Sequence, residues 1–284
     1  MKILLDPALV LDQPLDASFA AAVEHGYDGL ELGNRDDVIP ANSALAWSFD
    51  DLLAAGRRAR AAGTDVTSVA VIQQWSSPDE DQRAQAVTWW LDGAHAALEL
   101  GCRRINTELS GDPKHPDECR AAFLRSMEDV LPTLEREGIV MSVEPHPGDF
   151  VETTAGAVDL VDQMGSPSLR YLHCLPHTYY LGGTITEQVG LARGRFDHIH
   201  VADTYRPERT IINPADLDCR IHQHFDVGVG ELDWDEAAHA LASAGFDGIA
   251  TVQVFMWNDR AAESFRANRA AADRILVAPG GSAR

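Results

Sequence analysis

One pattern of apolar and polar positions recurs along the chain. An amphipathic segment with helical periodicity ends at a glycine, and a short apolar run follows within three residues; the glycines are Gly26, Gly63, Gly101, Gly138 and Gly245. Glycine just past a helix takes the left-handed conformation without steric cost. A short β-branched run is typical of a buried parallel strand. The repeat therefore predicts alternating helices and strands.

Eight helices and eight strands fit this pattern. The expected strands are 2–5, 28–32, 65–71, 103–108, 139–144, 169–173, 198–201 and 248–254. The expected helices are 15–25, 49–62, 79–100, 116–137, 154–164, 185–193, 233–244 and 259–276. Eight such units in 284 residues predict an α/β fold, a (β/α)8 TIM barrel. We expect residues 1–276 to form a single domain and residues 277–284 to be a frayed tail.

A doubly wound sheet is the alternative fold. That fold usually carries a GxGxxG phosphate-binding turn directly after a strand. The string GVGELDW at Gly228–Trp234 has neither that spacing nor a predicted strand before it. The barrel is therefore the preferred prediction.

Composition narrows the class of partner. The chain has 23 Lys and Arg against 44 Asp and Glu, a formal net charge of −21. This balance argues against nucleic acid and against an anionic membrane surface, which are bound through an excess of basic residues. No signal peptide and no apolar run of the ~18 residues that a membrane helix needs is found. The four cysteines show no CxxC spacing, so we expect a cytoplasmic protein with reduced thiols.

Candidate metal ligands fall where strands five to eight end. In a TIM barrel these ends meet at one face, where the chemistry takes place. Glu144, His177, His200 and Gln253 lie at such positions. Each alone is more often a hydrogen-bonded structural residue, but their convergence favours one divalent metal. Carboxylate, imidazole and amide groups suit manganese, with zinc, iron, magnesium or cobalt as alternatives.

Three histidines are candidate acid–base groups. His146 lies two residues beyond Glu144, so it points to the same side if the strand continues. Pro145 and Pro147 leave open whether the chain instead turns this side chain away. His222 and His224 alternate onto one face and supply a second acid, base or hydroxyl donor.

Five further residues are candidates for substrate binding. Glu31 and Glu108 can bind sugar hydroxyls or hold ligand histidines in place. Trp75, Phe255 and Trp257 can stack on a sugar or an aromatic group, although aromatic side chains at a barrel rim also serve as ordinary loop anchors.

The chain resembles a known family in four motifs. They are Glu-Pro-His at 144–146, PHTYYLGG at 176–183, HIHVADT at 198–204 and HQHFDVGVGELDW at 222–234. Together they resemble the xylose-isomerase-like TIM barrels, which include sugar isomerases and epimerases, inosose dehydratases and the endonuclease IV type of repair enzyme. The motifs look most similar to the large catalytic subunit of bacterial C-glycoside deglycosidases. Those enzymes act on 3-oxo-glucosides of flavonoids, use a divalent metal and assemble with a small β subunit.

The resemblance implies metal ligands Glu, Asp, His and Glu at the ends of strands five to eight. Glu144 and His200 match the first and third of these positions, whereas the second falls on Cys174 and the fourth on Gln253. A hard metal favours oxygen and nitrogen over sulfur, so we expect His177 to replace the Asp. Cys174 is interpreted as a small buried residue.

The altered ligand set predicts the reaction. With one carboxylate instead of three, the charge of the metal site changes from about −1 to about +1, which makes the metal a stronger Lewis acid. A stronger Lewis acid favours proton abstraction next to a ketone. Combined with what the resemblance implies, this gives the leading hypothesis of a metal-dependent lyase that cleaves the C-glycosidic or a related bond of a 3-oxo-sugar, with His146 removing the proton next to the ketone. The alternatives are a sugar or polyol isomerase, epimerase or dehydratase, and a non-catalytic barrel subunit. We expect an oxidised sugar or glycoside as ligand and an oligomer, and the resemblance implies that a small β subunit is part of it.

Overall fold

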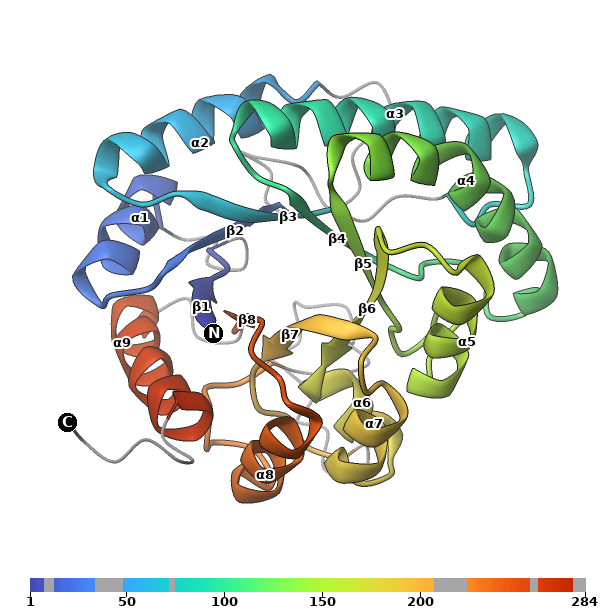
Figure 1. Ribbon diagram of the computed structural model, residues 1–284. Helices are drawn as coiled ribbons and strands as arrows, with labels where there is room; N and C mark the ends of the chain where they lie inside the picture. Colours follow the sequence, from blue (N-terminus) through green and yellow to red (C-terminus); the bar gives the residue numbers. More distant parts are fainter. Residues whose placement is uncertain (8–12, 34–47, 72–74, 207–223, 256–259, 278–284) are drawn as a thin grey trace, which may run out of the picture.

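Eight parallel strands close into a barrel in chain order. The computed structural model describes residues 1–7, 13–33, 48–71, 75–206, 224–255 and 260–277. The strands are β1 Lys2–Leu5, β2 Gly29–Gly33, β3 Val66–Ala70, β4 Arg104–Glu108, β5 Val140–Glu144, β6 Leu169–Cys174, β7 Phe196–Val201 and β8 Ile249–Val252. Strand β1 pairs with both β2 and β8, which closes the sheet (Figure 1). The predicted (β/α)8 barrel is confirmed.

Helices surround the strands as an outer ring (Figure 1). They are α1 Leu15–Glu24, α2 Asp50–Ala62, α3 Glu80–Glu99, α4 Pro116–Glu137, α5 Thr154–Met164, α6 Leu175–Leu181, α7 Ile185–Leu191, α8 Trp234–Ala244 and α9 Ala261–Ala272. A π-helical turn, Asp273–Val277, follows α9. Gly138 ends α4 with φ 66°, the left-handed conformation that the repeat predicts.

Helix α6 was not predicted. It begins directly after β6, and Pro176 lies in its first turn, where a missing backbone N–H costs nothing. Its seven residues are too few to show a periodic pattern. The consequence is that His177 is presented from a helix next to the strand end rather than from an extended loop.

A polar layer lies inside the barrel beneath the carboxyl ends of the strands. Asn106 on β4 contacts Ser68 Oγ on β3 at 3.0 Å and His198 Nδ1 on β7 at 3.2 Å. Strands β4 and β7 are not neighbours, so these side chains meet in the interior. The buried members are Glu31, Ser68, Asn106, His198 and Thr251. Barrel interiors are usually filled by branched apolar residues, so this layer points to a function.

Two further observations concern membrane-spanning helices and the state of the cysteines. Among the helices within the described ranges, none is both long and apolar enough to span a lipid bilayer. Cys102, Cys119 and Cys174 are buried free thiols.

Candidate metal and acid–base site

Glu144, Cys174 and His200 bring three metal-binding atoms together at the ends of β5, β6 and β7. One ligand atom from each lies within 4.8 Å of the others. His200 Nδ1 is 2.9 Å from Glu144 Oε1. Metal bonds of roughly 2.0–2.3 Å to oxygen, nitrogen and sulfur place ligand atoms at similar separations. A buried carboxylate, imidazole and thiol that converge in this way fit a divalent cation.

His177 and His224 extend this group on the side of Cys174. One ligand atom from each of these three residues again lies within 4.8 Å of the others. His177 Nδ1 donates to the carbonyl of Pro145 at 3.1 Å, and His224 Nδ1 donates to the carbonyl of Gln253 at 2.8 Å. A proton on Nδ1 leaves the ring lone pair on Nε2, the form in which imidazole binds metals.

Cys174 belongs to both groups, which changes its interpretation. Its side chain is fully buried, as the sequence predicted, but it lies between ligand-type atoms rather than among apolar neighbours. His177 belongs with Cys174 and His224 to one group of ligand-type atoms, so the structure also brings the predicted replacement ligand beside Cys174. Both residues remain candidates for the position of the family's aspartate.

The electrostatics of the group centre on His200. Burial lowers the pKa of His200, but the charges of Glu144 and Glu31 outweigh it and hold this pKa well above its usual range. Burial raises the pKa of Glu144, yet the nearby His200 and His177 hold it below its usual range. Burial lowers the pKa of His224 to about 3. His224 is therefore neutral, and Glu144 and His200 form an ion pair.

A second cluster contains His146, Glu108 and Asp149. Strand β5 ends at Glu144 and the His146 amide donates to Val151 O, so the chain does turn at the prolines. The His146 ring nevertheless packs edge-on against His177, with centroids 4.7 Å apart. Its Nδ1 is 3.3 Å from Asp149 Oδ2. Asp149 was not predicted, although its position three residues after His146 was a visible signal.

The pKa values of His146 and Glu108 bear on the prediction that His146 is the base. Burial lowers the pKa of His146, but the charge of Glu108 and the hydrogen bond to Asp149 raise it to about 9. Burial raises the pKa of Glu108 to about 7, with repulsion from Glu144 adding to the effect and His146 opposing it. At neutral pH, His146 holds a proton and Glu108 is the group poised to accept one.

Gln253 forms its hydrogen bonds with Asp6 and His224 rather than with Glu144 or His200. Its Nε2 donates to Asp6 Oδ2 at 3.2 Å, and its backbone carbonyl holds His224. Its amide oxygen is the atom that a metal would use, and its role as a ligand stays a prediction.

Two of the predicted substrate contacts need correction. Trp75 is fully buried and stacks on Trp90 with ring centroids 4.8 Å apart, so it packs in the core and cannot reach a substrate. Glu31 is also fully buried and contacts His198 and His200, which leaves only the other predicted role, that of holding a histidine. A strand-end position reveals neither burial, because Trp75 is covered by Trp90 of α3 and Glu31 by side chains of other strands inside the barrel.

Phe255 contacts one of the predicted histidines. Phe255 stacks on His224 with centroids 4.3 Å apart, which orients that imidazole. His222 and Trp257 lie outside the described residues.

Asp203 connects the HIHVADT motif to the GVGELDW motif through its hydrogen bonds. Its backbone pairs with Phe225 in an antiparallel bridge, which places His224 beside Cys174. Its carboxylate accepts hydrogen bonds from the amides of Thr204, Gly228 and Leu232 and from the indole of Trp234. This carboxylate therefore shapes the loop that carries His224.

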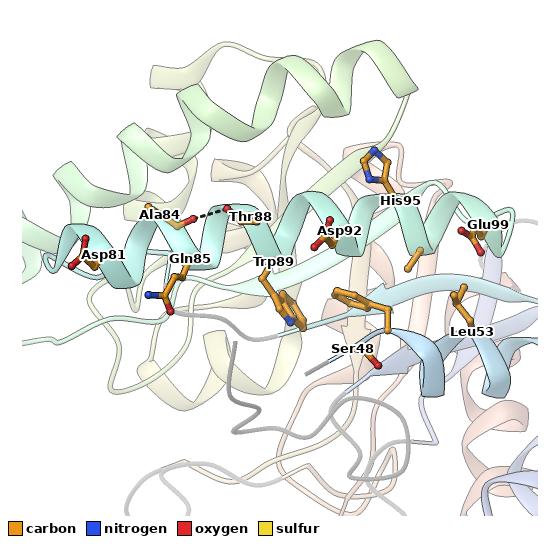
Figure 2. A pocket seen from close by; sticks show the side chains of 12 residues that line it. Ser48, Leu53, Asp81, Ala84, Gln85, Thr88, Trp89, Asp92, His95 and Glu99 are labelled. Atoms are coloured by element: carbon orange, nitrogen blue, oxygen red, sulfur yellow. Dashed lines mark hydrogen bonds between the residues drawn. The ribbon is translucent and has the colours of Figure 1, made fainter. Parts of the chain in front are cut away.

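Two cavities differ in their position relative to the candidate site. A groove of about 860 Å³ lies between α2 and α3 outside the barrel, with Phe49, Leu53 and Trp89 among its lining residues (Figure 2). None of the predicted site residues lines it, and most of its polar groups come from one helix. A cavity of about 370 Å³ instead adjoins the acid–base cluster through Asp149, with Ser76, Ser110 and Cys119 in its wall. This second cavity is the better candidate for part of a substrate.

Comparisons with known proteins agree with this fold. A curated relative, the D-psicose 3-epimerase of Enterocloster bolteae, is 23% identical over 155 residues, which are 54% of this chain and 43% of that protein. The aligned part spans less than half of the relative's length. Among solved structures, the IolI protein with a bound zinc atom has a TM-score of 0.76 at 19% identity and covers 97% of this chain and 98% of its own. The 3-keto-D-glucoside 4-epimerase from E. coli has a TM-score of 0.71 at 18% identity, covering 95% and 98%.

The likeness to those structures shows the fold alone. The family described as Xylose isomerase-like TIM barrel goes further, because its model matches residues 19–271. The match runs from α1 to α9 and includes every strand end that carries a candidate ligand. The chain belongs to the xylose isomerase-like TIM barrel family.

Proposed function

We propose that this protein is a divalent-metal-dependent enzyme that removes the proton next to the ketone of an oxidised sugar. The observation that carries the proposal is geometric. A metal-type group, Glu144, Cys174 and His200, lies beside a proton-handling group, Glu108, His146 and Asp149, at one end of the barrel. Two of the similar proteins are named as epimerases of a keto sugar or a 3-keto glucoside, which supports this substrate class.

Zinc suits the donor set better than the manganese expected from sequence. That expectation assumed oxygen and nitrogen donors, whereas Cys174 adds sulfur. A thiolate with imidazole and carboxylate is a typical zinc set. Glu144 and His200 would hold the metal with Cys174, His177 or His224 completing the set. The bound metal would supply Lewis acid polarisation of the ketone.

Glu108 and His146 each carry out one of the two proton transfers. The Glu108 carboxylate accepts the proton from the carbon next to the ketone, since its pKa of about 7 suits a base at neutral pH. The His146 imidazolium, held by Asp149, donates a proton to the group that leaves. This reverses the role predicted for His146, which was that of the base.

The leading reaction is elimination from a 3-oxo-glycoside. The proton leaves the carbon that lies between the ketone carbon and the anomeric carbon. A double bond then forms between this deprotonated carbon and the anomeric carbon. The anomeric bond to the aglycone breaks with its electron pair, and the aglycone takes a proton from His146. The cavity beside Asp149 supports a glycoside as the substrate, because a glycoside has a second part to accommodate.

Epimerisation is the second candidate, supported by the names of the similar proteins. It shares the first proton transfer, but a proton then returns to the opposite face of the same carbon. The two reactions therefore differ in whether a bond to a leaving group breaks.

One experiment separates these functions. The purified protein is analysed for bound metal and incubated with 3-oxo-glycosides and with free ketoses. Release of an aglycone supports the lyase, and interconversion of sugars without release supports the epimerase. Sub-stoichiometric metal together with no metal-dependent thermal shift contradicts both and favours a non-catalytic subunit. Repeating the assay on the protein isolated with its co-purifying partners tests for the expected small β subunit.

A further inference from the structure

The imidazole of His200 lies between two buried carboxylates that come from different strands. Its Nδ1 is 2.9 Å from Glu144 Oε1 and its Nε2 is 2.9 Å from Glu31 Oε1. Glu31 and His200 are 169 positions apart in the chain. Only one ring nitrogen can bind a metal while the other keeps a proton, so the two carboxylates have different roles.

We propose that Glu31 is a positioning residue, which holds His200 in the tautomer that directs the Nδ1 lone pair at the metal. The proposal rests on the proposed metal site. Nδ1 faces Glu144, which shares the ligand group with Cys174. Nε2 lies on the other side of the ring, beside Glu31 and His198, and the buried Glu31 carboxylate is placed to accept its proton. A carboxylate that accepts the second N–H of a ligand histidine orients the ring and raises its basicity.

Glu31 is itself held rigidly, which this role requires. Its second carboxylate oxygen contacts Asn106 Nδ2, lies 3.3 Å from His198 Nε2, and accepts from Thr251 Oγ1 at 3.4 Å. The side chain is 0% exposed, so neither water nor substrate competes for these contacts. In this proposal, the polar layer of the barrel interior supports the ligand His200 through Glu31.

Charge gives a second reason for a carboxylate at this position. Gln253 stands where the resemblance implies a carboxylate ligand, and its amide is neutral. Glu31 returns one negative charge to the neighbourhood of the metal without occupying a coordination position. Because Glu31 would act through the imidazole ring and not contact the metal, it would leave a coordination position available to substrate.

The test uses the full chain and Co²⁺ as a spectroscopic probe. Unaltered protein, Glu31→Gln and Glu31→Asp are stripped of metal and titrated with Co²⁺ against a chelating dye. We expect Glu31→Gln to bind Co²⁺ roughly 10–100-fold more weakly and to show a shifted visible absorption band. Glu31→Asp keeps the charge with a shorter reach, and it shows the same loss if position matters and a smaller loss if charge dominates.

A matched control replaces another buried carboxylate. Asp226 accepts from Asn268 Nδ2 at 2.7 Å and does not belong to the ligand group, so Asp226→Asn should leave Co²⁺ affinity unchanged. The melting temperature of each metal-free variant shows whether it folds.

Two results would overturn the inference. Equal Co²⁺ affinity and an identical spectrum in Glu31→Gln would leave Glu31 without this role while the metal site stands. The second result comes from the ¹⁵N-histidine NMR spectrum of the zinc-loaded protein. A protonated Nδ1 and a metal-bound Nε2 on His200 would also contradict the role of Glu31 while leaving the metal site in place. No Co²⁺ binding by the unaltered protein would contradict the metal site itself, and this inference with it.

Discussion

The Sγ atom of Cys174 lies 4.0 Å from Nε2 of His224, and both side chains are buried. This contact joins the end of β6 to the loop that Asp203 shapes after β7. It places sulfur among the nitrogen and oxygen donors of the candidate metal group. The choice of metal is therefore the property most directly open to test.

Replacing Cys174 should change metal preference. Cys174→Ala should weaken Zn²⁺ binding by at least tenfold, since a thiolate is lost, and Cys174→Asp should shift preference towards Mn²⁺, which favours oxygen. Metal content and competition titrations measure both effects. Cys102→Ala, at another buried thiol, is the control. Zinc retained in Cys174→Ala but lost in His177→Ala would show that His177 is the ligand, as the sequence analysis predicted.

The Glu108–His146 pair predicts a bell-shaped pH dependence of turnover. Activity should rise as Glu108 loses its proton near pH 7 and fall as His146 loses its proton near pH 9. Glu108→Gln should lower kcat by about 10²–10⁴-fold and remove the acidic limb, with metal content unchanged. His146→Asn should remove the basic limb. A profile unaltered in both variants would exclude these residues from proton transfer.

His173 predicts a loss of stability in mild acid. It is fully buried beside Tyr171, and burial lowers its pKa to about 4 from 6.5. Because the unfolded chain takes the proton first, the stability that the neutral ring provides is lost as the pH falls from 6.5 towards 4. Between pH 7 and pH 5 this amounts to about 2 kcal/mol.

Urea unfolding at the two pH values measures this effect. His173→Phe keeps an aromatic ring at the site and should reduce the loss between pH 7 and pH 5 by that amount. His239→Gln on α8 is the exposed histidine control. An unchanged pH dependence in His173→Phe would show that the acid sensitivity comes from other groups.

The loop that carries His224 should not tolerate a side chain at Gly230. An added Cβ would lie 2.3 Å from Asp203 Oδ1 and 2.4 Å from the Thr204 carbonyl. We expect Gly230→Ala to lower the free energy of unfolding by about 1–3 kcal/mol and to lower kcat by displacing His224. Gly190→Ala on α7 meets nothing within 4 Å and should be neutral or stabilising. Equal stability of the two variants would contradict the close contact.

Local sequence patterns were sufficient for most elements. The predicted strand 2–5 and the predicted helices 116–137 and 154–164 match β1, α4 and α5 in both bounds. Periodicity, glycine after a helix and β-branched runs are properties of neighbouring residues, so they can be recognised without a tertiary structure. Helix α6 escaped because seven residues carry no such period.

The sequence by itself determined the barrel and the strand ends at which Glu144 and His200 stand, because both follow from local periodicity and from the connection rules of parallel strands. Only the tertiary structure decided that Trp75 is core, that Glu31 is buried against His198 and His200, and that the pKa of Glu108 is raised to about 7 and that of His146 to about 9. Burial and electrostatic pKa shifts depend on distances between residues far apart in the chain, and these distances are set only when the sheet closes.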